Sequence, residues 1–147
     1  MMSVIVMTTI GDVPRERQPM SDNIFPAPPG FRWRFVPEGP FAGQFRSILR
    51  MDARVVVVWV GADDAVGRAA KLIGRLLGAG LPIVIAVAEI HDPPTESALR
   101  QAGALYICAN EAQHRLGHVL ESILGPPSRS TDVKTVEPTR EVKMDAG

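Results

Sequence analysis

Acidic side chains and one histidine follow two apolar runs of this sequence. Asp63 and Asp64 come after the first run, and Glu89 and His91 lie at the end of the second. If both runs are parallel strands, their carboxyl ends meet at one edge of a sheet, where such sheets bind ligands. Carboxylates gathered there could hold Mg²⁺, and a histidine beside them could exchange protons. These four residues form a candidate ligand rim.

A structural interpretation of the same residues stays open. Asp64 and Asp92 are suited to cap helices, and the remaining charges would then be solvated loop residues. His91 has no nucleophile near it in the sequence. His114 and His118 have the i, i+4 spacing of a metal site but no third ligand in sight. We therefore predict no catalytic residues, no bound metal and no cofactor.

The known loops for phosphate and acyl chemistry are absent from the sequence. Gly61 and Gly67 flank two aspartates, which matches neither G-x-G-x-x-G nor the P-loop pattern. No G-x-S-x-G elbow exists. The single cysteine, Cys108, excludes an internal disulfide and a cysteine-rich zinc site. An enzyme is thus the less favoured expectation.

Charge and hydropathy restrict the partners. Sixteen basic and sixteen acidic residues cancel, so no overall field attracts nucleic acid or an anionic membrane. Arg68, Lys71 and Arg75 form a basic stripe on one predicted helix, most simply its solvent face. No run reaches the ~20 apolar residues needed to span a bilayer. We expect a cytoplasmic protein with no nucleic-acid or membrane partner.

The two apolar runs predict the architecture. Residues 54–61 hold four consecutive valines, which favour strand, and residues 81–90 are similarly apolar. Neither run alternates apolar with polar residues, so both faces of each strand should be covered. With helical segments between the strands, this predicts an α/β fold, a three-layer α/β/α sandwich with a mainly parallel sheet. The predicted core is led by Val55, Val57, Trp59, Ile83, Ile85, Val87, Ile107 and Leu120.

Further elements follow from local patterns. Residues 31–36 alternate aromatic and arginine side chains, which is typical of an edge strand. A helix from Pro40 should present Phe41, Phe45, Ile48 and Leu49 as its apolar stripe. The helix after Asp63 or Asp64 should face the sheet with Val66, Ala69, Ala70, Ile73 and Leu77. A helix starting at Asp92, a strand at 105–108 and a helix marked by Leu116, Val119, Leu120 and Ile123 complete the order.

The chain divides into three zones. Residues 1–30 form a proline-rich extension, with residues 3–8 as a candidate first strand, and Met20 offers an alternative start. Residues 31–125 form the α/β domain, and residues 126–147 are polar and without periodicity, as in a disordered tail. We expect both outer zones to be dispensable for folding. The apolar residues at 4–6 leave the opposite outcome open, a central first strand.

From about Arg54 to Leu124 the chain resembles the second half of a response-regulator receiver domain. The proline-led run Pro82–Ala88 resembles the family's fourth strand, and Ala98–Ala104 resembles the helix end that precedes its fifth strand. Tyr106 stands at the position of the family's switch aromatic. The resemblance implies a flavodoxin-like fold with strand order 2-1-3-4-5.

The reactive positions depart from that family. Trp59 stands where the phospho-accepting aspartate ends the third strand, Val87 replaces the switch serine or threonine, and Ala109 replaces the lysine. Residues 8–10 offer no acidic pair for a metal. The resemblance therefore implies a degenerate pseudo-receiver: a non-catalytic regulatory domain in signal transduction that binds a protein partner. The alternative is a small Mg²⁺-dependent enzyme or ligand-binding domain that uses the rim at Asp63, Asp64, Glu89 and His91.

Overall fold

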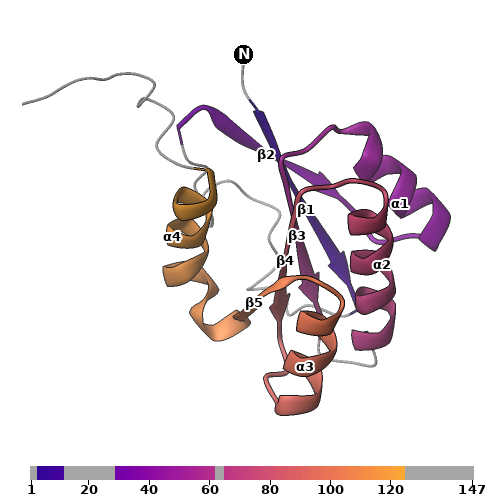
Figure 1. The fold of residues 1–147 in the computed structure, drawn as a ribbon, viewed down its shortest axis with the longest axis vertical. Coiled ribbons are helices and arrows are strands. Elements are labelled where there is room, and N and C mark those ends of the chain that lie inside the picture. The colour runs from indigo at the N-terminus through magenta and orange to yellow at the C-terminus, as the bar shows by residue number, and fades with distance from the viewer. Residues whose placement is uncertain (1–2, 12–28, 62–64, 125–147) are drawn as a thin grey trace, which may run out of the picture.

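The computed structural model describes residues 3–11, 29–61 and 65–124, and these form a five-stranded sheet with helices on both faces (Figure 1). The strands run in the order β2-β1-β3-β4-β5, and every neighbouring pair is parallel. Their bounds are β1 Ser3–Ile10, β2 Phe31–Val36, β3 Val55–Val60, β4 Ile83–Ala88 and β5 Leu105–Cys108. The helices are α1 Phe41–Arg50, α2 Val66–Gly78, α3 Pro93–Gln101 and α4 Ala112–Leu124, the last preceded by a 3₁₀ turn at Ala109–Glu111.

The helices divide unequally between the two faces of the sheet. Figure 1 shows α1, α2 and α3 on one face and α4 on the other. The predicted three-layer α/β/α sandwich with a parallel sheet is confirmed. No helix in the described ranges has the length and apolarity to cross a bilayer.

The burial of strand β3 on both faces explains why its sequence does not alternate apolar with polar residues. Val56, Val58 and Val60 pack in the core beneath α1, α2 and α3. Val55, Val57 and Trp59 pack in the second core, beneath α4. All six side chains are buried, because a strand alternates its side chains between two faces and both faces here are covered. Of the predicted core residues, Ile83 alone is half-buried, since it begins β4 at the sheet margin.

Strand β1 corrects one expectation. Ser3–Ile10 pairs with β2 on one side and with β3 on the other, so it lies inside the sheet. The candidate first strand is confirmed, and its central place argues against the expectation that residues 1–30 are dispensable for folding. The periodicity of an isolated segment does not show which strands it will pair with. The rest of that zone, residues 12–28, and the predicted tail lie outside the described residues.

Helix α1 turns a different face inward from the one predicted. Gln44 is buried, whereas Leu49 is 37% exposed. At about 100° per residue Gln44 lies roughly 40° from Ile48 on the helix surface, whereas Leu49 is rotated roughly 100° from Ile48 in the other direction. The buried face of α1 therefore includes Gln44 and Ile48, and Leu49 at the end of the predicted stripe lies outside it.

Helix α2 differs in a similar way. Its buried residues are Ala69, Leu72, Ile73 and Leu76, whereas Val66, Ala70 and Leu77 are half-buried. The helix packs against α1 and α3 as well as on the sheet, so its buried arc is wider than a single sheet-facing stripe. Ala65 precedes the helix as its N-cap residue, and Asp63 and Asp64 lie outside the described residues.

The end of α3 depends on a glycine. Gly103 has a φ of 109°, and a Cβ at this position would lie 2.5 Å from Leu77 Cδ1 on α2. The left-handed backbone strains any larger residue here, and its Cβ would also displace the end of the Leu77 side chain. The backbone N–H groups of Gly103 and Ala104 donate to the carbonyls of Arg100 and Leu99, which closes the helix.

Candidate functional site

Four residues form one row across the carboxyl end of the sheet. Thr9 of β1 pairs with Trp59 of β3, Trp59 with Val87 of β4, and Val87 with Ile107 of β5. Trp59, Val87 and Ile107 are each at most 1% exposed, and Ala109 lies in the same core cluster. The indole Nε1 of Trp59 donates to Glu89 Oε2 at 2.8 Å. The middle of this edge is therefore filled by an indole and aliphatic side chains.

The predicted ligand rim is only partly visible. Asp63 and Asp64 fall outside the described residues. Glu89 is half-buried and accepts from Trp59, whereas His91 is exposed and contacts Tyr106. Within the described ranges no three His, Cys, Asp or Glu side chains are grouped so as to hold a metal. The magnesium alternative stays a prediction.

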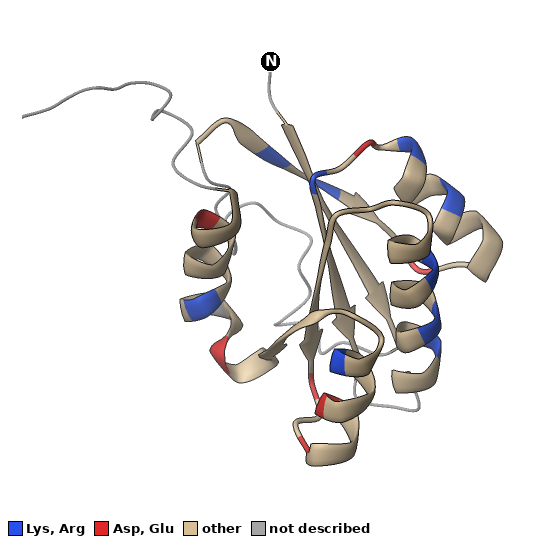
Figure 2. Cartoon of the chain, in the orientation of Figure 1, with Lys and Arg blue, Asp and Glu red and all other residues tan. Residues whose placement is uncertain are grey.

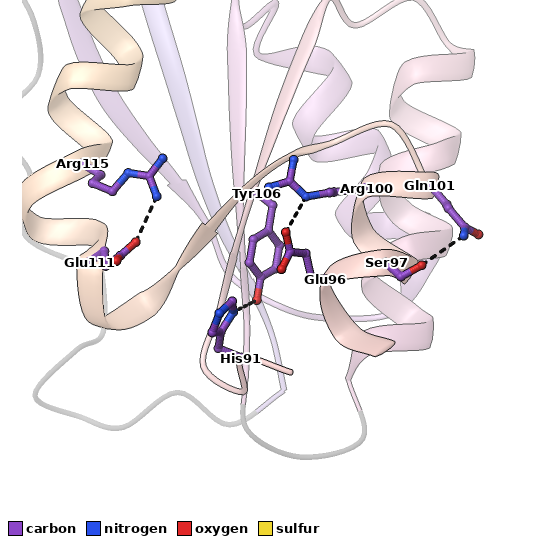
Figure 3. Close-up of polar contacts among 8 residues, drawn as sticks. All are labelled: His91, Glu96, Ser97, Arg100, Gln101, Tyr106, Glu111 and Arg115. Carbon is purple, nitrogen blue, oxygen red and sulfur yellow. Dashed lines mark hydrogen bonds and ion pairs between the residues drawn. The ribbon is translucent and has the colours of Figure 1, made fainter. Parts of the chain in front are cut away.

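A polar cluster surrounds Tyr106 next to the rim (Figure 3). His91 Nδ1 lies 2.8 Å from the Tyr106 hydroxyl oxygen. The guanidinium carbon of Arg100 lies 5.6 Å from the centre of the Tyr106 ring, and Arg100 Nε donates to Glu96 Oε2 at 2.8 Å. The loop after β4, helix α3 and strand β5 thus meet at this phenol. The cluster fixes Tyr106 in an inward position, with 8% of the residue exposed.

Two titrating groups of this cluster are perturbed. Asp92 Oδ1 accepts from the Thr95 backbone N–H at 2.9 Å, which confirms the predicted helix cap. Hydrogen bonds from Thr95 lower the pKa of Asp92. Burial raises the pKa of Tyr106 to about 12, with smaller contributions from the negative charges of Cys108, Glu96 and Asp92, and Arg100 opposes the shift.

We predict that Tyr106 keeps its proton well above pH 10 in the folded protein. It is the only tyrosine of the chain, so phenolate absorbance reports on it alone. Its midpoint should be about 12, against the ordinary value of 10.0 in the urea-unfolded chain. Because the folded state holds this proton more tightly, stability is retained below pH ~10 and declines as the pH rises toward 12. A folded-state midpoint near 10 would contradict the inward phenol.

Sequence reasoning missed a second polar cluster, at the ends of β1 and β2. The buried Thr8 Oγ1 donates to Val36 O at 2.6 Å and accepts from Gln44 Nε2 at 2.7 Å. Glu38 accepts from Arg68 Nη1 at 2.5 Å and from the Gly11 backbone N–H. Gln44 follows Phe41 by three positions and precedes Ile48 by four, and this helical spacing could have predicted its burial. No local pattern could have predicted the pairing of Glu38 with Arg68, because 30 positions separate the two.

The strand order and layers define a receiver-like α/β fold, as the sequence resemblance implied. No protein-family model matches the chain, and no curated protein matches it. Among solved structures it is similar to the response regulator RcsB of Salmonella typhimurium, whose description concerns conformational dynamism for DNA interaction. The TM-score is 0.55 at 13% sequence identity over 84% of this chain. The match spans 61% of the RcsB chain, less than two thirds of its length.

Proposed function

We propose that this chain is a regulatory domain of signal transduction that works through protein contacts and without aspartate phosphorylation. The observation that carries the proposal is the row Thr9, Trp59, Val87 and Ile107 at the carboxyl edge of the sheet. Accepting a phosphoryl group requires a carboxylate nucleophile, oxygen ligands for Mg²⁺ and a cation for the developing charge. This row provides a buried indole and aliphatic side chains in place of the carboxylate.

The loss of the other reactive groups supports the same proposal. Ala109 is buried beside Ile107 and has no charge to offer a phosphoryl oxygen. Val87 has no hydroxyl that could turn toward such a group. Tyr106 retains the aromatic position and is held inward by His91 and Arg100. A domain with these residues would keep one conformation and act as a fixed docking unit.

The docking face that we propose lies along β5 and α4. β5 is an edge strand, paired only with β4, and its first residue, Leu105, is 45% exposed. A groove of about 370 Å³ lies between the strand and the helix, and it is lined by both apolar and polar side chains. Such a mixture is typical of protein interfaces. The groove is lined by Leu105, Arg115, His118, Val119, Ser122 and Ile123.

The experiment compares capture of a partner by the full chain and by two charge variants in extract of the native source. Leu105→Glu places a carboxylate in the groove, and Leu49→Glu does the same to a comparably exposed leucine on α1, across the sheet. The partner should be retained by the wild type and by Leu49→Glu and be lost with Leu105→Glu. Adding acetyl phosphate and Mg²⁺ should change nothing. Capture that requires acetyl phosphate, or that survives Leu105→Glu, would refute the proposal. We place this interaction in the cytoplasm.

A further inference from the structure

A second cavity lies on the face of the sheet that α1 and α2 cover, away from the groove beside α4, and its lining has the features of a ligand site. This open cavity of about 160 Å³ is lined by the end of β1, the loop after β2, the start of α1 and helix α2. Ile10 and Phe41 are its apolar residues, and Gln44, Glu38, Arg68 and Lys71 are its polar ones. It shares no residue with the candidate rim or with the groove beside α4.

The charges of the cavity leave one cation uncompensated. Both carboxylate oxygens of Glu38 are engaged, one by Arg68 and one by the Gly11 backbone N–H. Lys71 Nζ lies 5.0 Å from the centre of the Phe41 ring and, within the described residues, makes no ion pair. Figure 2 shows basic residues along α2, and Arg68 and Lys71 of this helix line the cavity. Arg68, Lys71 and Glu38 therefore leave a net positive charge suited to a monoanion.

The buried amide of Gln44 adds a hydrogen-bonding requirement. Gln44 is 6% exposed, and its Nε2 donates to Thr8 Oγ1 at 2.7 Å and to Thr9 O at 3.2 Å. Those bonds commit the donor end of the amide, whereas no described residue donates to its carbonyl oxygen. This oxygen is not fully buried, so it is open to a hydroxyl donor from a ligand. α1 also begins here, and its N-cap Pro40 supplies no side-chain acceptor, so the helix dipole favours an anion nearby.

We propose that this cavity binds a small hydroxycarboxylate, a monoanion with an apolar body and a hydroxyl donor. Lys71 would hold the carboxylate, Gln44 would accept from the hydroxyl, and Ile10 and Phe41 would contact the carbon chain. The volume of about 160 Å³ is well below the ~300 Å³ at which pockets for drug-sized ligands begin, which favours a small ligand over a nucleotide. Binding here is independent of the partner surface at Leu105.

The test is a ligand titration of the ¹⁵N-labelled full chain, in which the amide chemical shifts are monitored by NMR. The probes are lactate, propionate, which lacks the hydroxyl, and lactamide, which lacks the charge. Lactate should give saturable shifts at Ile10, Phe41, Gln44 and Lys71, including the side-chain amide of Gln44. Propionate should bind more weakly, and lactamide should give no saturable shift at these residues.

The matched variants are Lys71→Gln and Arg46→Gln, which each remove one exposed cation, the second from α1 outside the cavity lining. Lys71→Gln should weaken lactate binding about tenfold, the loss expected for one charge-assisted hydrogen bond. Arg46→Gln should bind as the wild type. Absence of saturable shifts at the solubility limit of lactate, equal binding of lactamide, or an unchanged affinity in Lys71→Gln would each overturn the proposal. Leu105→Glu should bind lactate normally, so this test is separable from the partner experiment.

Discussion

A chain that begins at Met20 is expected not to fold. This chain lacks strand β1, which lies between β2 and β3. Both neighbours would lose the backbone hydrogen bonds that they make with it. Ile5, Val6, Met7 and Ile10 are at most 3% exposed. Burial of four such side chains contributes roughly 6–12 kcal/mol before the cost of ordering, comparable to the net stability of a whole domain. Circular dichroism and thermal melting of the purified chain would measure the loss.

Two control variants show whether the loss of folding is due to strand β1. Val6→Asp in the full chain places a carboxylate in the core of β1, and it should unfold the domain without removing residues 11–19. A chain that ends at Leu124 should melt at the wild-type temperature, because the predicted tail is polar and aperiodic. A cooperative, wild-type melt of the chain from Met20 would show that β1 is not needed by the sheet.

Replacing Trp59 by alanine should cost about 3–5 kcal/mol of unfolding free energy, the usual loss for a large buried aromatic side chain. Trp59 is 1% exposed and packs between β1, β4 and α4. The substitution would also leave Glu89 without the indole N–H that donates to it at 2.8 Å. Urea unfolding followed by circular dichroism measures the change.

The conservative variant separates packing from the hydrogen bond. Trp59→Phe keeps an aromatic ring in the core but removes the N–H, so it should lose clearly less stability than Trp59→Ala. If Trp59→Ala costs less than about 1 kcal/mol, the indole does not fill the carboxyl edge of the sheet as described. That result would also remove the main support for a lost phosphorylation site.

Much of the fold could be predicted because its signals are local. The unbroken valine run of β3 indicates burial on both faces, and the structure places Val56 and Val57 in separate cores. Asp92 before Pro93 and Pro94 predicts a capped helix start, which the Thr95 hydrogen bond confirms. The alternation in β2 predicts an edge strand, and the structure places β2 at one edge of the sheet with Arg32 and Arg34 exposed.

The candidate site was harder to predict because it depends on contacts between distant residues. The place of β1 in the sheet is set by its pairing with β2 and β3, and no pattern within residues 3–10 indicates these partners. Glu38 meets Arg68 across 30 positions, and His91 meets Tyr106 only when α3 returns the chain to the sheet. The spacing of Gln44 indicates its burial, but its hydrogen-bond partners Thr8 and Thr9 lie 36 and 35 positions away and could not be predicted.

The proposal of a receiver-like domain without phosphorylation is tested most directly by incubating the full chain with acetyl phosphate and Mg²⁺ and measuring its intact mass. A receiver domain that accepts phosphate under the same conditions serves as the positive control. Because Trp59, Val87 and Ala109 occupy the edge where a carboxylate, a hydroxyl and a cation would be needed, we predict that the mass of this chain stays unchanged. A stable increase of one phosphoryl group, mapped to any aspartate of the chain, would contradict the account.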